Sequence, residues 1–277
     1  MPKVRANGIT LNYDEQGAGE PLILIPYLAA DHACCAFQVA EYSKHFTCIS
    51  LDLRGTGESE NPGGEYSTED LAEDVAAFMQ ALGIARAHIS GLSLGAAVGM
   101  WLAAKHPDNV ATLSLHSAWQ KTDPFVGAIA ENWQAVATAF GSVADMVIGT
   151  LFPWCLTPEL YNARPDYIQS LAAFVRSRPA QPVASFLQQS NAVIAHDAES
   201  QLSRITAPTL ITLGDRDVLT SARFSEPMKQ RIRNAELLIF EGCAHAAIYE
   251  RVEEFNAKTL AFLGRHAKGS VASSGAA

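Results

Sequence analysis

Short runs of apolar residues alternate with amphipathic segments along most of this chain. Residues 22–25 and 47–51 are apolar runs with the length of a strand that is buried on both faces, and residues 37–42 between them are amphipathic. Strands that alternate with helices are typical of a parallel sheet covered by helices. The pattern therefore predicts an α/β fold.

The first quarter of the chain also carries turn and helix signals. Asn7-Gly8 separates two strand-like segments and favours a two-residue hairpin turn, so we expect the chain to begin with an antiparallel pair. Ser67, with Asp70 three residues later, resembles a capping box, and apolar positions recur at helical spacing after it. These signals predict a hairpin followed, further on, by a long amphipathic helix.

A long aromatic-rich stretch interrupts the alternation. Residues 111–115 predict a strand, but the next strand is predicted only at residues 208–213. The residues between them are too many for a loop, and prolines divide them into short segments. Several short helices that form an inserted cap would account for this composition.

The chain is accordingly predicted to contain a core, a cap and a tail. Residues 1–117 and 201–266 form the core. After the strand at residues 208–213, the second part of the core is predicted to contain a helix, a strand and a final helix. Residues 118–200 form the helical cap. Residues 267–277 are almost all small or polar and are predicted to be a disordered tail.

The composition excludes several classes of protein. The chain has 277 residues, 48% of them hydrophobic and 18% charged, as in an ordinary globular protein. Its net charge of −9 argues against nucleic acid as a partner. No segment has the length and apolarity of a membrane span or of a signal peptide core, so we expect a cytoplasmic protein without membrane association. The five cysteines suggest neither a disulfide framework nor a zinc site.

The strongest chemical signal is the sequence Gly91-Leu92-Ser93-Leu94-Gly95. An apolar strand precedes it, and residues 96–104, which are apolar or small all round, predict a buried helix after it. A sharp strand-to-helix turn of this kind exposes a serine hydroxyl, and glycine is needed where a Cβ would collide with neighbouring backbone. Ser93 is the candidate nucleophile, and the N–H of Leu94 is the first candidate donor to an oxyanion.

A serine nucleophile needs a base and an acid that orients the base. His245 follows the last predicted strand and Asp217 follows the strand before it, so both should lie at the sheet edge that carries Ser93. The order Ser, Asp, His along the chain is the one expected for such a sheet. Asp215 and Asp123 remain alternatives for the acid.

Together, these motifs resemble those of the α/β-hydrolase family, over nearly the whole chain. Residues 52–59, Asp-Leu-Arg-Gly-Thr-Gly-Glu-Ser, are similar to a structural loop that is common after the fourth strand of such proteins. The resemblance implies an eight-stranded, mostly parallel sheet with helices on both faces and an inserted helical cap. In detail the chain is similar to the branch that contains 3-oxoadipate enol-lactonases and aminoacrylate-type hydrolases.

The chain departs from this family after its third predicted strand. Such hydrolases usually carry His-Gly there, and the next residue supplies the second oxyanion N–H; this chain has Pro26-Tyr27 followed by Leu28. By position, Leu28 inherits the donor role. The change introduces a phenol beside the predicted site, so Tyr27 is a candidate substrate-binding residue. Trp119 and Trp154, from the cap, are two further candidates.

These residues predict a serine hydrolase that cleaves a carboxylic ester or lactone through an acyl-enzyme, without a metal or organic cofactor. Its partner would be a small-molecule substrate, and the protein would be a monomer or homodimer. Carbon–carbon bond hydrolysis or cofactor-free perhydrolysis by the same triad is an alternative. A ligand receptor with a slow or idle triad is an alternative from another class.

Overall fold

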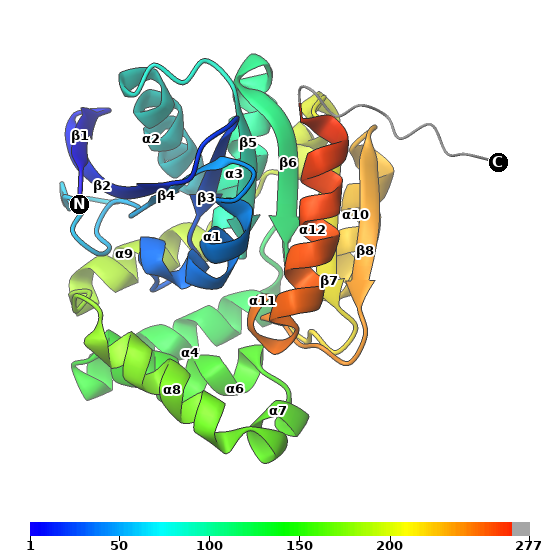
Figure 1. Ribbon diagram of the computed structural model, residues 1–277. Coiled ribbons are helices and arrows are strands. Elements are labelled where there is room, and N and C mark those ends of the chain that lie inside the picture. Colours follow the sequence, from blue (N-terminus) through cyan, green and yellow to red (C-terminus); the bar gives the residue numbers. More distant parts are fainter. Residues whose placement is uncertain (268–277) are drawn as a thin grey trace.

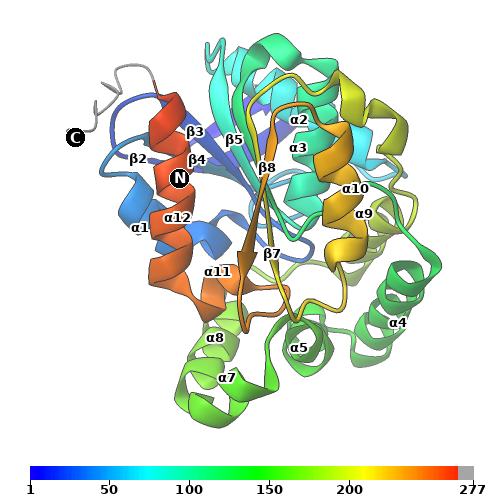
Figure 2. The same ribbon diagram turned by 90° about the vertical axis from the view of Figure 1, so that its right-hand side faces the viewer.

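The computed structural model describes residues 1–267, which form one eight-stranded sheet with helices on both faces (Figures 1 and 2). The strand order is β1-β2-β4-β3-β5-β6-β7-β8. The strands are β1 Lys3–Ala6, β2 Ile9–Gln16, β3 Pro21–Ile25, β4 Thr47–Leu51, β5 Ala87–Leu92, β6 Val110–His116, β7 Thr209–Gly214 and β8 Ala235–Phe240. This architecture confirms the predicted fold class.

The first two strands are antiparallel and the others are parallel. Asn7 and Gly8, with φ values of 47° and 79°, form the turn between β1 and β2. Two successive positive φ values suit the twist of a tight hairpin, which is why Asn-Gly is found there. The parallel strands β3, β5, β6, β7 and β8 therefore all end at one edge of the sheet.

Helices cover the two faces of the sheet. Figure 2 shows α1 (Ala36–Tyr42) and α12 (Val252–His266) on one face, and α2 (Thr68–Ala81), α3 (Leu94–Lys105) and α10 (Ala222–Arg231) on the other. The predicted capping box at the start of α2 is confirmed, since Ser67 and Asp70 each accept a hydrogen bond from the other's backbone N–H. Nearly every residue of α3 is buried against β5 and β6, which explains its lack of a polar face.

Helices of 4 to 17 residues lie between β6 and β7 in the sequence and cover the carboxyl edge of the parallel strands (Figure 1). They are α4 Pro124–Phe140, α5 Val143–Met146, a π-helical turn Val147–Leu151, α6 Phe152–Cys155, α7 Pro158–Ala163, α8 Pro165–Ser177 and α9 Val183–Ile194. Three of them, α4, α7 and α8, begin with a proline, whose fixed φ suits the first helical position. We call α4–α9 the cap.

Four short helices complete the described chain: η1 His32–Cys35, η2 Pro107–Asn109, η4 Glu199–Arg204 and α11 Ala247–Glu250. Within residues 1–267, no helix combines the length and apolarity that crossing a membrane requires. The predicted disordered tail, apart from residue 267, lies outside the described residues.

Candidate active site

Ser93 occupies a strained turn between β5 and α3. Its φ and ψ are 53° and −115°, a conformation that costs a non-glycine residue free energy. Hydrogen bonds hold it there: the Ser93 N–H donates to the carbonyl of His116 over 2.9 Å, and the Ser93 carbonyl accepts from the N–H groups of Ala96 and Ala97. Strain held by the surrounding backbone is typical of a functional position.

The two glycines of the motif let the turn pack against other backbone. A Cβ on Gly91 would lie 2.1 Å from the Gly95 carbonyl oxygen, and one on Gly95 would lie 2.2 Å from the carbonyl oxygen of Ile25. Neither distance is possible for real atoms. The predicted collision of a Cβ with neighbouring backbone is therefore confirmed at both glycines. The structure adds that the start of α3 lies directly against the end of β3.

We expect Gly95→Ala to lower the free energy of unfolding by about 3 kcal/mol or more, because the new methyl group would displace the backbone of β3. Gly264 in α12 is the matched control, since a Cβ there meets no atom within 4 Å. Gly264→Ala should raise stability by up to about 1 kcal/mol through helix propensity. Urea denaturation measures both values; similar stabilities for the two variants would contradict this packing.

His245 and Asp217 follow β8 and β7, and both side chains are buried. His245 Nδ1 lies 2.9 Å from Asp217 Oδ2. The Ser117 hydroxyl donates to the His245 carbonyl over 2.6 Å, which fixes the loop that carries the imidazole. The structure thus brings the predicted base and the predicted acid into direct contact.

The environment of Asp217 keeps its carboxylate charged. Burial alone would raise its pKa, but the charge and hydrogen bond of His245 and the hydrogen bonds of Thr220 lower the pKa below its ordinary value. The N–H groups of Leu219 and Thr220 donate to Oδ1, and the Thr220 hydroxyl donates to Oδ2. An ionised Asp217 accepts the Nδ1 proton of His245, which leaves Nε2 as the proton acceptor of the neutral imidazole.

The two alternative acids have other partners. Asp215 accepts a hydrogen bond from the N–H of Gly242. Asp123 caps α4 by accepting from Val126 N–H, and its other oxygen lies 2.9 Å from Nε of Arg223. The geometry therefore favours Asp217 as the acid.

A cavity of about 310 Å³ lies between the sheet edge and the cap, and Ser93 and His245 both line it. Leu28 lines it as well, on the turn after β3 that packs against the start of α3. Leu94 is the first residue of α3, so its N–H is one of the unpaired donors of a helix N-terminus. The two predicted oxyanion donors thus belong to neighbouring segments beside Ser93.

Tyr27 lines the same cavity and belongs to a chain of hydroxyl groups. Its hydroxyl lies 3.0 Å from that of Tyr249, which donates to the carbonyl of Cys34 over 2.7 Å. Because the Tyr249 proton is committed to Cys34, Tyr27 is the donor in the first bond. Burial raises the pKa of both phenols, so both are neutral.

The two tryptophans predicted to bind substrate differ in position. Trp119 lines the cavity, and its indole N–H donates to Thr122 Oγ1 over 2.8 Å. Trp154 is 38% exposed, lies outside the cavity lining and packs edge-to-face on Phe125. The short helix α6 directs Phe152 and Cys155 into the cavity and Trp154 away from it. We therefore withdraw Trp154 as a candidate substrate contact.

Sequence reasoning missed residues that support the site. The Glu250 carboxylate accepts from Ala244 N–H, next to His245, and from the N–H and hydroxyl of Thr157 in the cap. It therefore ties the histidine loop to the cap, and no local pattern in the sequence signals this. The bond from Leu219 N–H to Asp217 was detectable, because aspartate side chains often accept from the backbone N–H two residues on, but this pattern does not signal the Thr220 hydroxyl.

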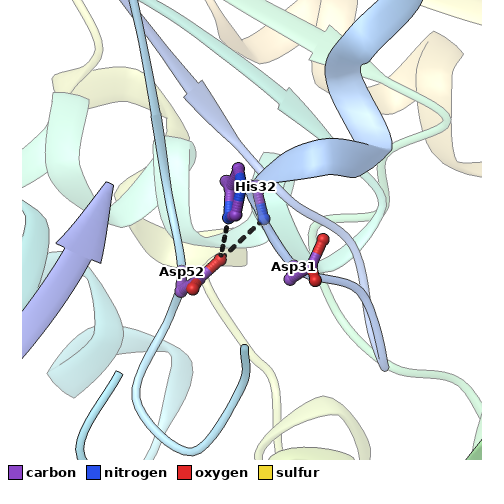
Figure 3. Close-up of side chains that lie close together, drawn as sticks. All are labelled: Asp31, His32 and Asp52. Carbon is purple, nitrogen blue, oxygen red and sulfur yellow. Dashed lines mark hydrogen bonds and ion pairs between the residues drawn. The ribbon is translucent and has the colours of Figure 1, made fainter. Parts of the chain in front are cut away.

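Asp31, His32 and Asp52 form a buried cluster near the turn after β3 (Figure 3). Their ligand-type atoms lie within 4.8 Å of one another, which would suit a metal ion. The atoms have protein partners instead: Asp52 accepts from the backbone N–H and Nδ1 of His32, over 2.8 and 2.7 Å, and Asp31 is paired with Arg178 of the cap. These contacts therefore stabilise the turn between β3 and η1.

This cluster makes stability depend on pH. Burial alone would lower the pKa of His32, but the hydrogen bond to Asp52 and the charges of Asp52 and Asp31 raise it, against the opposing charge of Arg178. A proton on His32 therefore stabilises the fold: the contribution is complete below about pH 6.5, the ordinary pKa, and is lost as the pH rises through the higher folded pKa.

We expect His32→Gln to cost about 1.5 to 3 kcal/mol at pH 5.5, the range for a hydrogen bond to a charged group, and less at pH 9. Glutamine keeps a donor but cannot titrate, which isolates the effect of the charge. Urea denaturation of both proteins at the two pH values measures the difference. A cost that does not change with pH would show that His32 stays neutral.

Comparisons with known proteins agree with this architecture. The family model for the alpha/beta hydrolase fold matches residues 19–252. A putative carbamate hydrolase RutD from Azorhizobium caulinodans is 27% identical, over 95% of this chain and 98% of its own. The 3-oxoadipate enol-lactonase 2 of Acinetobacter baylyi is also 27% identical, over 94% and 95% of the two chains.

A solved structure shows the same likeness. The crystal structure of the enol-lactonase from Burkholderia xenovorans has a TM-score of 0.84 and 27% identity to this chain, and the match covers 95% of this chain and 99% of the other. Because the curated relatives are named as hydrolases, an enzyme is favoured over a receptor. The family match spans most of the sequence and the eight-stranded sheet agrees with it. The chain belongs to the α/β hydrolase fold family and is a hydrolase.

Proposed function

We propose that this hydrolase cleaves a carboxylic ester or lactone by a Ser-His-Asp mechanism. The observation that carries the proposal is the shared cavity, which Ser93 and His245 both line. The buried carboxylate of Asp217 orients His245 through the contact with its Nδ1. The strained Ser93, the histidine His245 and the charged Asp217 match the roles of nucleophile, base and orienting acid, respectively.

In this mechanism the Ser93 hydroxyl attacks the substrate carbonyl while Nε2 of His245 accepts its proton. The N–H groups of Leu94 and Leu28 stabilise the negative charge on the carbonyl oxygen. His245 then gives the proton to the leaving group, and an acyl-enzyme forms on Ser93. Water, activated by the same histidine, attacks the acyl group and releases the acid.

The acyl-enzyme can be tested by partitioning between water and methanol. For the p-nitrophenyl, phenyl and ethyl esters of one acid, a common acyl-enzyme gives the same ratio of free acid to methyl ester, because the leaving group has departed before the ratio is set. The ratio is measured by chromatography of the products. Ratios that depend on the leaving group would argue against a shared intermediate and therefore against this mechanism.

Tyr27 is proposed to position the substrate in this reaction. Its ring lines the cavity, and its hydroxyl bond to Tyr249 holds the ring in place. We expect Tyr27→Phe to raise KM about 2- to 10-fold with little change in kcat, because one hydrogen bond contributes about 0.5 to 1.5 kcal/mol. Steady-state kinetics measures both constants. Unchanged kcat and KM would exclude this role for the hydroxyl.

A further inference from the structure

The cavity beside Ser93 has no fixed charge to offer an ionic substrate. Among the described residues that line it, none is an aspartate, glutamate, lysine or arginine. The thiols and phenols in its wall are neutral, because burial raises the pKa of the thiols of Cys34 and Cys155 and of the phenols of Tyr27, Tyr167 and Tyr249.

Two nearby arginines are held by other partners. Arg178 lies 2.8 Å from Asp31 and lines an adjoining, smaller cavity, but not the active-site cavity itself. Arg223 is paired with Asp123 at the start of α4 and does not line the active-site cavity. An anionic group inside the cavity would therefore lose its hydration without gaining a partner of opposite charge, which is strongly unfavourable.

Among the described residues that line the cavity, Trp133 has a buried side-chain donor without a partner. Trp133 of α4 lines the cavity and is 7% exposed, and its indole N–H is buried without a hydrogen bond among the described residues. Trp119 lines the same cavity, but its indole N–H is bonded to Thr122. A buried donor without an acceptor costs free energy. A ligand in the cavity that supplies an acceptor recovers this free energy once the indole turns its buried N–H toward the ligand.

We propose that the part of the substrate that fills this cavity is neutral and mainly apolar, with one oxygen acceptor that binds the indole N–H of Trp133. This inference rests on the proposed function, since it describes the substrate of the same site. The volume of about 310 Å³ suits a medium-length chain or a single ring. Within the ester and lactone class, such a cavity excludes substrates with a second, ionised carboxylate.

The first test compares three p-nitrophenyl esters of similar length: the heptanoate, the methyl adipate and the hydrogen adipate. They are, in order, apolar, neutral with an ester group as acceptor, and anionic. We expect kcat/KM for the hydrogen adipate to be at least about 100-fold lower than for the methyl adipate, because the carboxylate loses its hydration. Equal or faster cleavage of the anionic ester would overturn the inference.

A second test isolates the indole N–H. Trp133→Phe keeps an aromatic ring and removes the donor, so kcat/KM should fall about 3- to 10-fold for the methyl adipate and less than about 2-fold for the heptanoate. Trp119→Phe is the control, and it should affect both esters alike because its N–H is already bonded to Thr122. Equal effects of Trp133→Phe on both esters, or no effect, would overturn the role of Trp133.

Labelling of Ser93 by a fluorophosphonate distinguishes a failure of the substrate inference from a failure of the proposed serine mechanism. If Ser93 is labelled and the anionic ester is preferred, the substrate inference is wrong and the serine mechanism stands. If Ser93 is not labelled by a reagent that inactivates the enzyme, the proposed function itself fails.

Discussion

Replacing Ser93 with alanine should lower kcat for ester hydrolysis by about 10⁴- to 10⁶-fold, the range for removal of a serine nucleophile that acts as a unit with its histidine. The variant loses the hydroxyl that forms the acyl-enzyme but keeps the cavity and the backbone donors of Leu28 and Leu94. The residual rate should therefore still exceed that of the reaction in water.

Stability provides the control for Ser93→Ala. Serine and alanine share the Cβ atom, so the substitution does not relieve the strained φ of 53° and removes no hydrogen bond made by the backbone. The melting temperature should change by no more than a few degrees, equivalent to about 1 kcal/mol. A folded Ser93→Ala variant with more than a few per cent of wild-type kcat would contradict the nucleophilic role.

Replacing Asp217 with asparagine should lower kcat by about 10⁴-fold, because the amide favours the wrong tautomer of the histidine. The Asp217 carboxylate accepts hydrogen bonds from His245 Nδ1, from the Thr220 hydroxyl and from two backbone N–H groups. An asparagine has only one acceptor oxygen. Its NH₂ group, placed against Nδ1, would require that nitrogen to be unprotonated, so that Nε2 carries the proton and cannot act as the base.

Asp215→Asn and Asp123→Asn are matched controls for this effect. Both remove a carboxylate near the same sheet edge, but neither side chain bonds to His245. We expect kcat to stay within about threefold of the wild-type value in both, since each loses only local hydrogen bonds or an exposed ion pair. If kcat fell about 10⁴-fold in one of the controls while the Asp217→Asn variant stayed active, the residue changed in that control would be the acid instead of Asp217.

Most of the fold was predictable because its elements have strong local signals. Asn7-Gly8 specifies the hairpin turn, and Ser67 with Asp70 specifies the start of α2, through backbone conformations and caps that depend on neighbouring residues. The short elements η1 and α11 were not predicted. They contain only four residues each, too few for a hydrophobic period, and tertiary contacts stabilise them.

The candidate triad was predictable for a different reason. Ser93, Asp217 and His245 each follow a parallel strand, and the carboxyl ends of such strands meet at one edge, so the sequence order carries spatial information. The cap offers no such rule. Its aromatic residues show no clear periodicity across the proline-separated helices, so the sequence could not distinguish Trp154, which faces outward, from Trp133, which lines the cavity.

The central claim is that Ser93 is the nucleophile of this hydrolase, and labelling tests it most directly. The protein is incubated with a fluorophosphonate until activity is lost, digested, and analysed by peptide mass spectrometry. The account predicts one adduct per chain, on the peptide that contains Ser93, and no adduct on the folded Ser93→Ala variant. Complete inactivation with the adduct on another residue, or full activity with Ser93 labelled, would contradict it.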